Sequence, residues 1–336
     1  MRLRHLLSAI PLLLICSACA PPQSILHPGG PAAGNLAQIG WIVFILFGAV
    51  AVVMWILLVW VVVRRRGSLE SHEPWNTGGG QRWVLIGGFA IPFVILCSVF
   101  VLALDRMSDF PVQDGEHVNP EIRVIGHQWW WQVEYIGSDP DKYVETANEI
   151  HIPVGKPVDI VLETRDVIHS FWVPAMHGKV DLIPGQPNYI RIEASHAGSF
   201  QGQCGEYCGE EHARMRLLVV AQAPEEYQLW LANQRKPAAF PQDTEAMHGQ
   251  EIFENAACAL CHTVRGTVAM GKVAPDLTHF ASREGIAANS YRNNEANLEA
   301  WVTHAQSLKP GAQMPDLTAF NGTDLRALVA YLRGLK

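Results

Sequence analysis

Two long apolar segments lie in the first third of the chain, which has 336 residues. Residues 40–63 are almost wholly apolar, and residues 83–104 form a second apolar run that contains Pro92. A helix rises about 1.5 Å per residue, so each run reaches the roughly 30 Å needed to cross the hydrocarbon core of a bilayer. A soluble hairpin rarely has two uninterrupted spans of this length. We therefore predict a transmembrane helical hairpin over residues 38–104, with a kink at Pro92.

Charged residues near these segments predict the orientation of the chain in a membrane. Arginines 64–66 end the first run and begin a short polar loop, which places that loop in the cytoplasm. Residues 1–20 carry two arginines before an apolar run and small residues, the pattern of a secretory signal peptide. Cleavage after Ala20 and lipidation at Cys19 are both open. Both long termini are then expected on the outer side of the membrane.

From residue 105 to about residue 236 the pattern changes to short runs with β character. Runs rich in β-branched and aromatic residues alternate with turn residues such as Pro184-Gly185. About 130 residues of this kind suit an antiparallel, Greek-key sandwich, which makes the middle of the chain an all-β domain. The runs that we assign to strands are residues 121–125, 129–135, 158–162, 189–192 and 215–220.

Two proline-rich stretches separate these regions from their neighbours. Residues 21–37 are rich in Pro, Gly and Ala and predict an extended linker before the membrane hairpin. Residues 237–243 predict a hinge after the β domain. Residues 244–336 then have helical periodicity, with Thr244 as the expected cap of the first helix and Thr323 as that of the last. We predict a third, all-α domain there.

Sulfur and imidazole side chains gather late in the β domain. Cys204, Cys208, His212 and Met215 follow one another closely, and His169 upstream supplies a second imidazole. Such ligands select copper or zinc over hard cations, and two bridging thiolates can hold two metal ions side by side. A zinc site would leave Met215 without a role, and a disulfide would leave the other three side chains unexplained. A binuclear copper centre uses all five.

The residues from Cys258 to His262 have the Cys-x-x-Cys-His spacing of a covalent haem c attachment site. The two thiols add to the haem vinyl groups, and the histidine ligates the iron. A redox-active Cys-x-x-Cys beside an unrelated histidine is the alternative. For the second axial ligand we choose Met314 over Met270, which we expect in a surface loop. His279 and His304 are weaker candidates.

Charge is uneven along the chain, whose formal net charge is −7. Residues 105–240 carry 20 acidic and 11 basic side chains. This acidic balance suggests cationic partners and argues against nucleic acid. Neither apolar run contains a histidine, so the membrane part cannot bind haem iron through imidazole. Oxygen and proton chemistry must therefore reside on a partner in the membrane.

The copper motif, from Cys204 to Met215, resembles the binuclear CuA centre of cytochrome c oxidase subunit II. With its ligands in late loops, the sandwich is similar to a cupredoxin domain. Residues 244–336 resemble a class I cytochrome c. Together the regions resemble the subunit II with a fused cytochrome c that is found in some bacterial haem–copper oxidases.

The resemblance implies roles for the matching residues of the β domain. Glu206 matches the position that gives its backbone carbonyl to copper, and its carboxylate matches a ligand of a magnesium ion shared with subunit I. Trp129 matches the residue at which electrons from a separate cytochrome c arrive. Asp166 and Asp181 match family positions to which we assign no role. The side-chain ligands of the copper pair are then His169, Cys204, Cys208, His212 and Met215.

The cytochrome c resemblance likewise implies contacts in the all-α domain. Pro275 matches the proline whose carbonyl holds the haem-ligating His262, although Ala274 replaces the usual glycine before it. The first and last helices of such domains cross. The residues expected at the crossing are Gly249, Phe253, Leu328 and Tyr331.

The function that the resemblance implies is electron input to a proton-pumping terminal oxidase. Electrons would pass from haem c to CuA and on to haem in subunit I, with subunits I and III as membrane partners. The donor would be a cytochrome c or a quinol–cytochrome c oxidoreductase complex. Two alternatives are the electron-input subunit of a CuA-containing nitric oxide reductase and a membrane-anchored copper carrier.

The second apolar run departs from the family pattern in one respect. Many members carry a glutamate there at the mouth of a proton path, but no acidic residue lies between Trp83 and Leu104. Leu85 lies near the corresponding position. Glu73 in the preceding loop is the candidate replacement.

Overall fold

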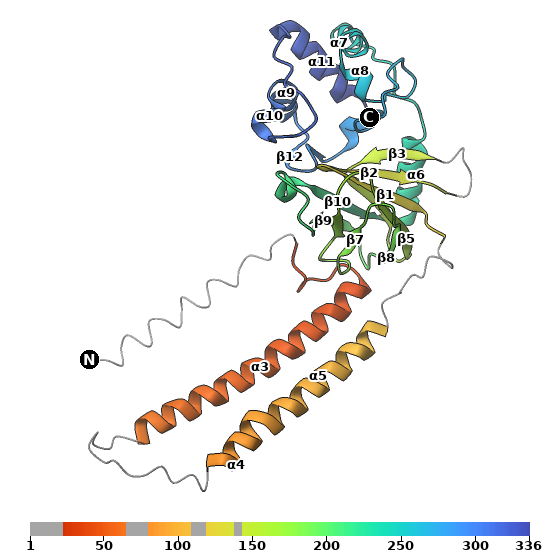
Figure 1. The fold of residues 1–336 in the computed structure, drawn as a ribbon. Helices are drawn as coiled ribbons and strands as arrows, with labels where there is room; N and C mark the ends of the chain where they lie inside the picture. Colours follow the sequence, from red (N-terminus) through yellow and green to blue (C-terminus); the bar gives the residue numbers. More distant parts are fainter. Residues whose placement is uncertain (1–22, 65–79, 109–118, 138–142) are drawn as a thin grey trace. The chain divides into compact units, whose positions relative to one another are not determined.

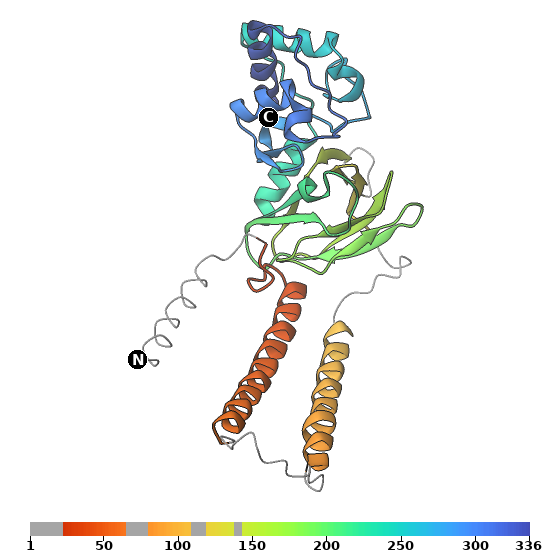
Figure 2. The same cartoon turned by 60° about the vertical axis from the view of Figure 1, so that its left-hand side comes forward.

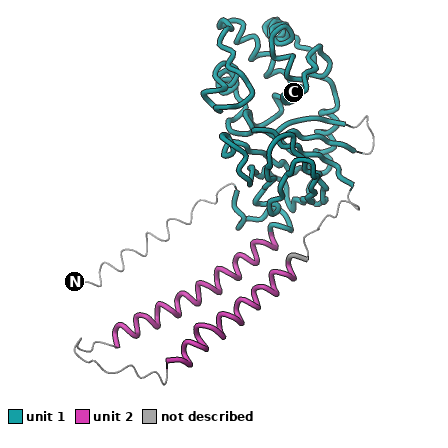
Figure 3. Tube along the Cα trace, viewed as in Figure 1, with its two compact units in different colours: residues 1–33, 112–336 teal, residues 34–111 magenta. Residues whose placement is uncertain are grey.

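The structure is a computed structural model that describes residues 23–64, 80–108, 119–137 and 143–336. The predicted signal peptide, most of the polar loop with Glu73, and part of the turn after residue 137 lie outside these ranges. The chain divides into two compact units (Figure 3). One unit comprises residues 34–111, and the other comprises residues 1–33 with residues 112–336. Each unit is described by itself.

The unit of residues 34–111 is built from two long apolar helices. Helix α3 covers Pro31–Arg64, and the second helical stretch covers α4 (Gly80–Leu85), η1 (Ile86–Ala90) and α5 (Ile91–Ser108). Both are long and apolar enough to cross a membrane. Large apolar side chains are exposed all round them, for example Phe44 at 72% and Trp55 at 67%. A helix that is apolar on every side is typical of a membrane span.

The prediction of an extended linker through residue 37 was wrong from Pro31 onward. Helix α3 begins at Pro31, nine residues before the predicted start of the span. Proline has a fixed φ and no backbone N–H, which suits the first position of a helix. The alanines that follow are strong helix formers, so the helix does not need the apolar run to begin.

A π-helical turn lies just before Pro92, where the sequence predicted a kink. In η1 the backbone N–H of Ile91 donates to the carbonyl of Ile86, one residue farther than in an α-helix. Pro92 cannot donate a backbone hydrogen bond, so a helix that includes it must adjust the preceding turn.

The β domain is a sandwich of two five-stranded sheets (Figure 1). The first sheet has the order β3-β2-β1-β5-β8, and the second has the order β4-β10-β9-β6-β7. The first sheet consists of β1 (Ile122–His127), β2 (Trp130–Tyr135), β3 (Val144–Ala147), β5 (Val158–Thr164) and β8 (Asn188–Ile192). The second consists of β4 (Glu149–Pro153), β6 (His169–Trp172), β7 (Val180–Leu182), β9 (Gly198–Cys204) and β10 (Arg216–Gln222).

The predicted sandwich is confirmed, and all five strand runs assigned from the sequence overlap observed strands. The pairing is not wholly antiparallel, since β1 pairs in parallel with β5 and β10 pairs in parallel with β4. Alternate residues of β2, namely Trp131, Val133 and Tyr135, are buried in the core. This alternation is the period-2 pattern of a strand with one face inward.

Helix α6 (Pro224–Gln234) corrects the prediction that β structure continues to residue 236. Pro224 at its first turn, followed by Glu225 and Glu226, is a helix-start signal that the β pattern obscured. Trp230 of this helix stacks on His151 of β4 with ring centroids 3.9 Å apart. The helix therefore packs against the sandwich.

The C-terminal part is helical, as predicted, and its first and last helices are in contact (Figure 1; Figure 2). These are α7 (Thr244–Asn255) and α11 (Gly322–Gly334). A Cβ atom at Gly249 would lie 1.9 Å from the Ala327 carbonyl oxygen. The rings of Phe253 and Tyr331 lie 5.6 Å apart. Between α7 and α11 lie α8 (Cys258–Cys261), η4 (Phe280–Ser282), β11 (Gly285–Ile286), β12 (Tyr291–Arg292), α9 (Glu295–Thr303) and α10 (Ala305–Leu308).

The two predicted helix caps were each displaced by one or two residues. Asp243 caps α7 by accepting a hydrogen bond from the Ala246 N–H, so Thr244 is already helical. Asn321 caps α11 by accepting from the Thr323 and Asp324 N–H groups. Asp and Asn are stronger N-cap residues than Thr, so each helix begins one or two residues earlier, at the stronger capping residue.

Candidate copper and haem sites

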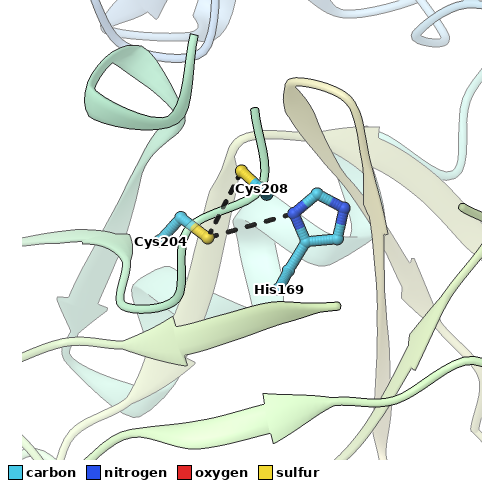
Figure 4. Close-up of side chains that lie close together, drawn as sticks. All are labelled: His169, Cys204 and Cys208. Atoms are coloured by element: carbon cyan, nitrogen blue, oxygen red, sulfur yellow. Dashed lines mark hydrogen bonds between the residues drawn. The ribbon is translucent and has the colours of Figure 1, made fainter. Parts of the chain in front are cut away.

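Three of the predicted copper ligands, His169, Cys204 and Cys208, come together in the sandwich domain (Figure 4). His169 begins β6 and Cys204 ends β9, and these two strands pair antiparallel. Met215 lies just before β10, and its carbonyl accepts a hydrogen bond from the Cys204 N–H. Strand pairing thus brings His169 close to a loop 35 residues later in the sequence.

The donor atoms of these residues form one buried cluster. The two cysteine Sγ atoms are 3.8 Å apart, which is far beyond the S–S bond length of about 2.05 Å, so the thiols are free. Other separations are His169 Nδ1 to Cys204 Sγ at 3.9 Å, His212 Nδ1 to Cys208 Sγ at 3.6 Å, Met215 Sδ to Cys208 Sγ at 3.8 Å, and the Glu206 carbonyl to Cys204 Sγ at 3.1 Å.

This donor set fits two metal ions better than one. Each sulfur of the central pair has its own imidazole neighbour, and Met215 is fully buried beside Cys208. A single tetrahedral zinc would leave at least one of these donors unused. Two bridging thiolates with an imidazole at each end provide the soft and intermediate ligands that copper favours.

The two thiols share a proton in the metal-free protein. The hydrogen bond between the two sulfurs, with help from His169, lowers the pKa of Cys204 to about 3. The neighbouring thiolate raises the pKa of Cys208 above its ordinary value. One thiolate is therefore available to a cation at neutral pH, and a metal must displace the proton of the other.

Asp166, to which the sequence analysis assigned no role, positions the His169 ring. Its Oδ1 lies 2.7 Å from His169 Nε2, and its Oδ2 accepts from the Gln128 N–H at 2.7 Å. Burial favours a neutral imidazole, but hydrogen bonds with Cys204 and Asp166 raise the pKa of His169. A carboxylate that fixes the far nitrogen directs the near one toward a metal.

The three tryptophans after Gln128 occupy different environments. Trp131 is fully buried in the core, with its ring edge-on to Phe171. Trp130 stacks on His127 with ring centroids 4.4 Å apart. Trp129 is half-buried, and its Nε1–H donates to the Cys208 carbonyl at 3.0 Å. Of the three, Trp129 is therefore the one hydrogen-bonded to the copper loop.

The Glu206 carboxylate, the predicted magnesium ligand, lies at the surface. Its Oε2 is 3.6 Å from Lys179 Nζ, and its side chain is 45% exposed. The carboxylate is therefore accessible to a partner, and the magnesium site stays a prediction.

A largely apolar cavity adjoins the Cys-x-x-Cys-His sequence, and we call it the haem cradle. Cys258 and Cys261 begin and end helix α8, and His262 follows directly. The His262 Nδ1–H donates to the Pro275 carbonyl at 2.7 Å, as predicted, and burial lowers the pKa of His262. A neutral imidazole held in this way keeps its Nε2 lone pair free for iron. The lining of the haem cradle includes Phe253, Leu277, Phe280, Leu298, Trp301, Leu317, Leu328 and Met314.

The cradle fits a haem in two respects. It is walled by aliphatic and aromatic side chains, which suit an apolar macrocycle. Arg283 is buried at its wall, and its Nε has no hydrogen-bond partner among the described residues. A guanidinium with a free donor is suited to an acidic group such as a haem propionate. The sequence analysis missed Arg283, because no local pattern separates it from a surface arginine.

Met314 is the only one of the four axial-ligand candidates that lines the cradle. Met270 is 75% exposed, in agreement with its predicted surface location. His279 Nε2 is hydrogen-bonded to the Lys236 carbonyl, and His304 Nδ1 to the Thr303 hydroxyl. Of these four candidates, Met314 is therefore the one that would hold the iron together with His262.

Sequence comparisons match both halves of this architecture. Family models for the periplasmic domain of cytochrome c oxidase subunit II and for cytochrome c match residues 138–222 and 246–336. Cytochrome c oxidase subunit 2 of Alkalihalophilus pseudofirmus is 33% identical over 335 residues, covering 97% of this chain and 95% of the relative. That of Bacillus subtilis is 29% identical, covering 100% of this chain and 98% of the relative. The crystal structure of the periplasmic domain of subunit II of cytochrome oxidase from Bradyrhizobium japonicum is 30% identical, covering 34% of this chain and 91% of that structure, with a TM-score of 0.32.

The fold defines a membrane-anchored protein that joins a cupredoxin-like sandwich to a cytochrome c domain. Both family models fall on the parts that carry the two clusters, and the relative from Alkalihalophilus extends the match to nearly the whole chain. The chain belongs to the cytochrome c oxidase subunit 2 family and is a subunit of an oxidase complex. The matching domain families suggest copper and haem c as its cofactors.

Proposed function

We propose that this chain is the electron-input subunit of a proton-pumping terminal cytochrome c oxidase. Electrons would pass from haem c to a binuclear CuA centre and on to haem in subunit I, where O2 is reduced to water. The observation that carries this proposal is the position of Trp129. Its ring lines the haem cradle, and its Nε1–H donates to the Cys208 carbonyl in the copper cluster. One side chain thus adjoins both sites.

The residues proposed for each centre follow from the geometry above. His169, Cys204, Cys208, His212 and Met215 would hold the two copper ions through their side chains. The Glu206 carbonyl completes this set. Cys258 and Cys261 would hold haem covalently, with His262 and Met314 as axial ligands. Bound copper and haem would supply one-electron chemistry, and the protein would fix their positions.

We propose the remaining features from the resemblance and the chain pattern. The domains would extend over residues 38–104, 105–236 and 244–336, with a hinge at 237–243. Subunits I and III would be the membrane partners, and magnesium would bind Glu206 at the subunit I interface. The two soluble domains would lie on the periplasmic side. The donor would be a cytochrome c or a quinol–cytochrome c oxidoreductase complex.

The assignment of Met314 can be tested against Met270 as a matched control. Met314→Leu should keep the covalent haem but lose thioether ligation, and the haem potential should fall because a methionine ligand raises it. Met270→Leu, at an exposed site, should leave both unchanged. Redox titration and the ferric haem spectrum measure these effects. An unchanged potential in Met314→Leu would exclude this residue as a ligand.

Electron flow through the two centres tests the proposed function directly. In the purified oxidase, flash reduction of haem c should be followed by bleaching of a near-infrared copper band, at a rate independent of protein concentration. Metal analysis should give two coppers per chain, with the resonance pattern of a mixed-valence pair. Zinc, a single copper, or a copper band that does not respond to haem reduction would contradict the proposal. The core subunit that co-purifies separates an oxidase from a nitric oxide reductase.

A further inference from the structure

A buried lysine joins the haem cradle to the sandwich. Lys309 is only 3% exposed. Its Nζ donates to three backbone carbonyls: that of Trp129 at 2.7 Å, that of Arg214 at 3.1 Å and that of Ala287 at 3.3 Å. The three donors of an ammonium group are thus matched by three acceptors.

The three carbonyls belong to parts of the chain that are distant in sequence. Trp129 directly precedes β2, and Arg214 ends η3 between the proposed copper ligands His212 and Met215. Ala287 follows β11 in the C-terminal part and lines the cradle. Lys309 therefore bonds both to the two sandwich segments nearest the copper cluster and to the cradle.

Further contacts hold residues 308–311, which precede Met314, against Arg214 and Trp129 of the sandwich. The Arg214 Nη1–H donates to the Leu308 carbonyl at 2.6 Å, so Arg214 and residues 308–309 bond in both directions. A Cβ atom at Gly311 would lie 3.4 Å from the Trp129 ring. The chain between Lys309 and Met314 therefore packs against the tryptophan.

Two neighbouring acidic groups partly offset the charge of Lys309. Burial lowers the pKa of Lys309 to about 7, and the Glu211 carboxylate and the Cys208 thiol oppose this shift. Glu211 is itself buried, and its Oε2 has no hydrogen-bond partner within the described ranges. A buried cation is costly unless its hydrogen bonds are made, so the contact is sensitive to the placement of all three carbonyls.

We propose that Lys309 is a positioning residue that holds the haem cradle against Trp129, beside the copper cluster. The docking role depends only on contacts between residues of this chain. Its consequence for electron transfer rests on the proposed function: the closer the cradle is held to Trp129, the faster one electron leaves the haem iron and reduces the copper pair.

Lys309→Met, which keeps the length of the side chain and removes its donors, tests this role. Amide hydrogen exchange in the purified complex should show faster exchange at Glu284 and Gly285, whose N–H groups donate to Glu149 of the sandwich. Loss of a buried, charged hydrogen-bonding group should lower their protection by about tenfold or more. Haem-to-copper transfer after flash reduction should slow, while the haem potential and the near-infrared band stay unchanged.

Lys272→Met is the matched control. Lys272 also links the two parts, through Glu145 at 3.2 Å, but its side chain is 65% exposed. An exposed pair contributes little, so exchange and transfer should change less than about twofold. Arg214→Gln is the second variant, in case Lys309→Met does not accumulate. It removes a charged hydrogen bond to the Leu308 carbonyl, next to Lys309 at the same contact, and should act in the same direction with a smaller effect.

The outcomes separate this role from the proposed function. Unchanged exchange and transfer in Lys309→Met, or in Arg214→Gln if that variant is needed, would overturn the role of Lys309. An unmutated chain with no haem-to-copper transfer would contradict the proposed function instead, and the exchange result would still decide the docking role. Equal effects of Lys309→Met and Lys272→Met would also overturn the role of Lys309, because the burial of Lys309 would then add nothing to the contact.

Discussion

Cys204→Ser is expected to abolish the binuclear copper centre and leave covalent haem attachment intact. Cys204 Sγ lies within 4 Å of Cys208 Sγ, His169 Nδ1 and the Glu206 carbonyl, so it contacts three other members of the cluster, as Cys208 does. A serine hydroxyl stays protonated and is a harder ligand, so it cannot bridge two copper ions. Substitution of residues that only support metal ligands typically costs about 10–100-fold in metal affinity or activity. Loss of the Cys204 thiolate, a ligand itself, should therefore lower copper-dependent turnover by more than about 100-fold.

Metal analysis, the near-infrared band and a haem stain on a denaturing gel measure the outcome of Cys204→Ser. Cys97→Ser is the matched control, because Cys97 is an exposed thiol on α5, in the unit of the chain that holds neither cluster. It should retain two coppers per chain and full turnover. Two coppers in Cys204→Ser would refute a bridging role for Cys204. Loss of covalent haem in Cys204→Ser would show that the two centres do not form independently.

The sequence identified most of the residues that gather at each site, because these residues lie close together along the chain. Cys204 to Met215 span one turn and a short 3-10 helix, and Cys258 to His262 span one helical turn, so spacing alone limits the geometry. His169 lies 35 residues from Cys204, and no spacing in the sequence shows that the two side chains meet. The pairing of β6 with β9 is the physical reason that they meet.

Long-range polar contacts were beyond sequence reasoning. Lys309 bonds to carbonyls 180 and 95 residues away, and a lone lysine before a proline has no local sign of burial. The same holds for Asp166, whose role appears only when its oxygens are seen on His169 and Gln128. Backbone acceptors have no side-chain signature, so such contacts require the fold.

Boundaries were predicted less well than elements, for local reasons. The apolar run defined the membrane span, but α3 begins earlier, at Pro31, because helix formation depends on backbone propensity as well as hydropathy. Helix α6 was missed because Leu229 and Trp230 also suit a β-strand pattern. Its proline and acidic first turn were the signals available.

Gly249→Ala is expected to destabilise the C-terminal helical part. The new Cβ would lie 1.9 Å from the Ala327 carbonyl oxygen and 2.8 Å from Tyr331 Cβ, where α7 contacts α11. Alanine gains about 1 kcal/mol of helix propensity over glycine. Overpacking typically costs about 1–3 kcal/mol and occasionally more. Because the clash is with backbone, which cannot rotate away, we expect a net loss of about 2 kcal/mol.

Gly334→Ala provides the matched control, since Gly334 ends α11 and a Cβ there would meet nothing within 4 Å. It should stay within about 0.5 kcal/mol of the unmutated chain. Denaturant unfolding of the full chain, followed by haem absorption, reports the C-terminal part, and the near-infrared band reports the sandwich. In Gly249→Ala the haem absorption should change at a lower denaturant concentration than in the unmutated chain. The transition of the near-infrared band should move less. Equal stability of the two variants would mean that the helices can separate at this contact without cost, which would contradict close packing of α7 on α11.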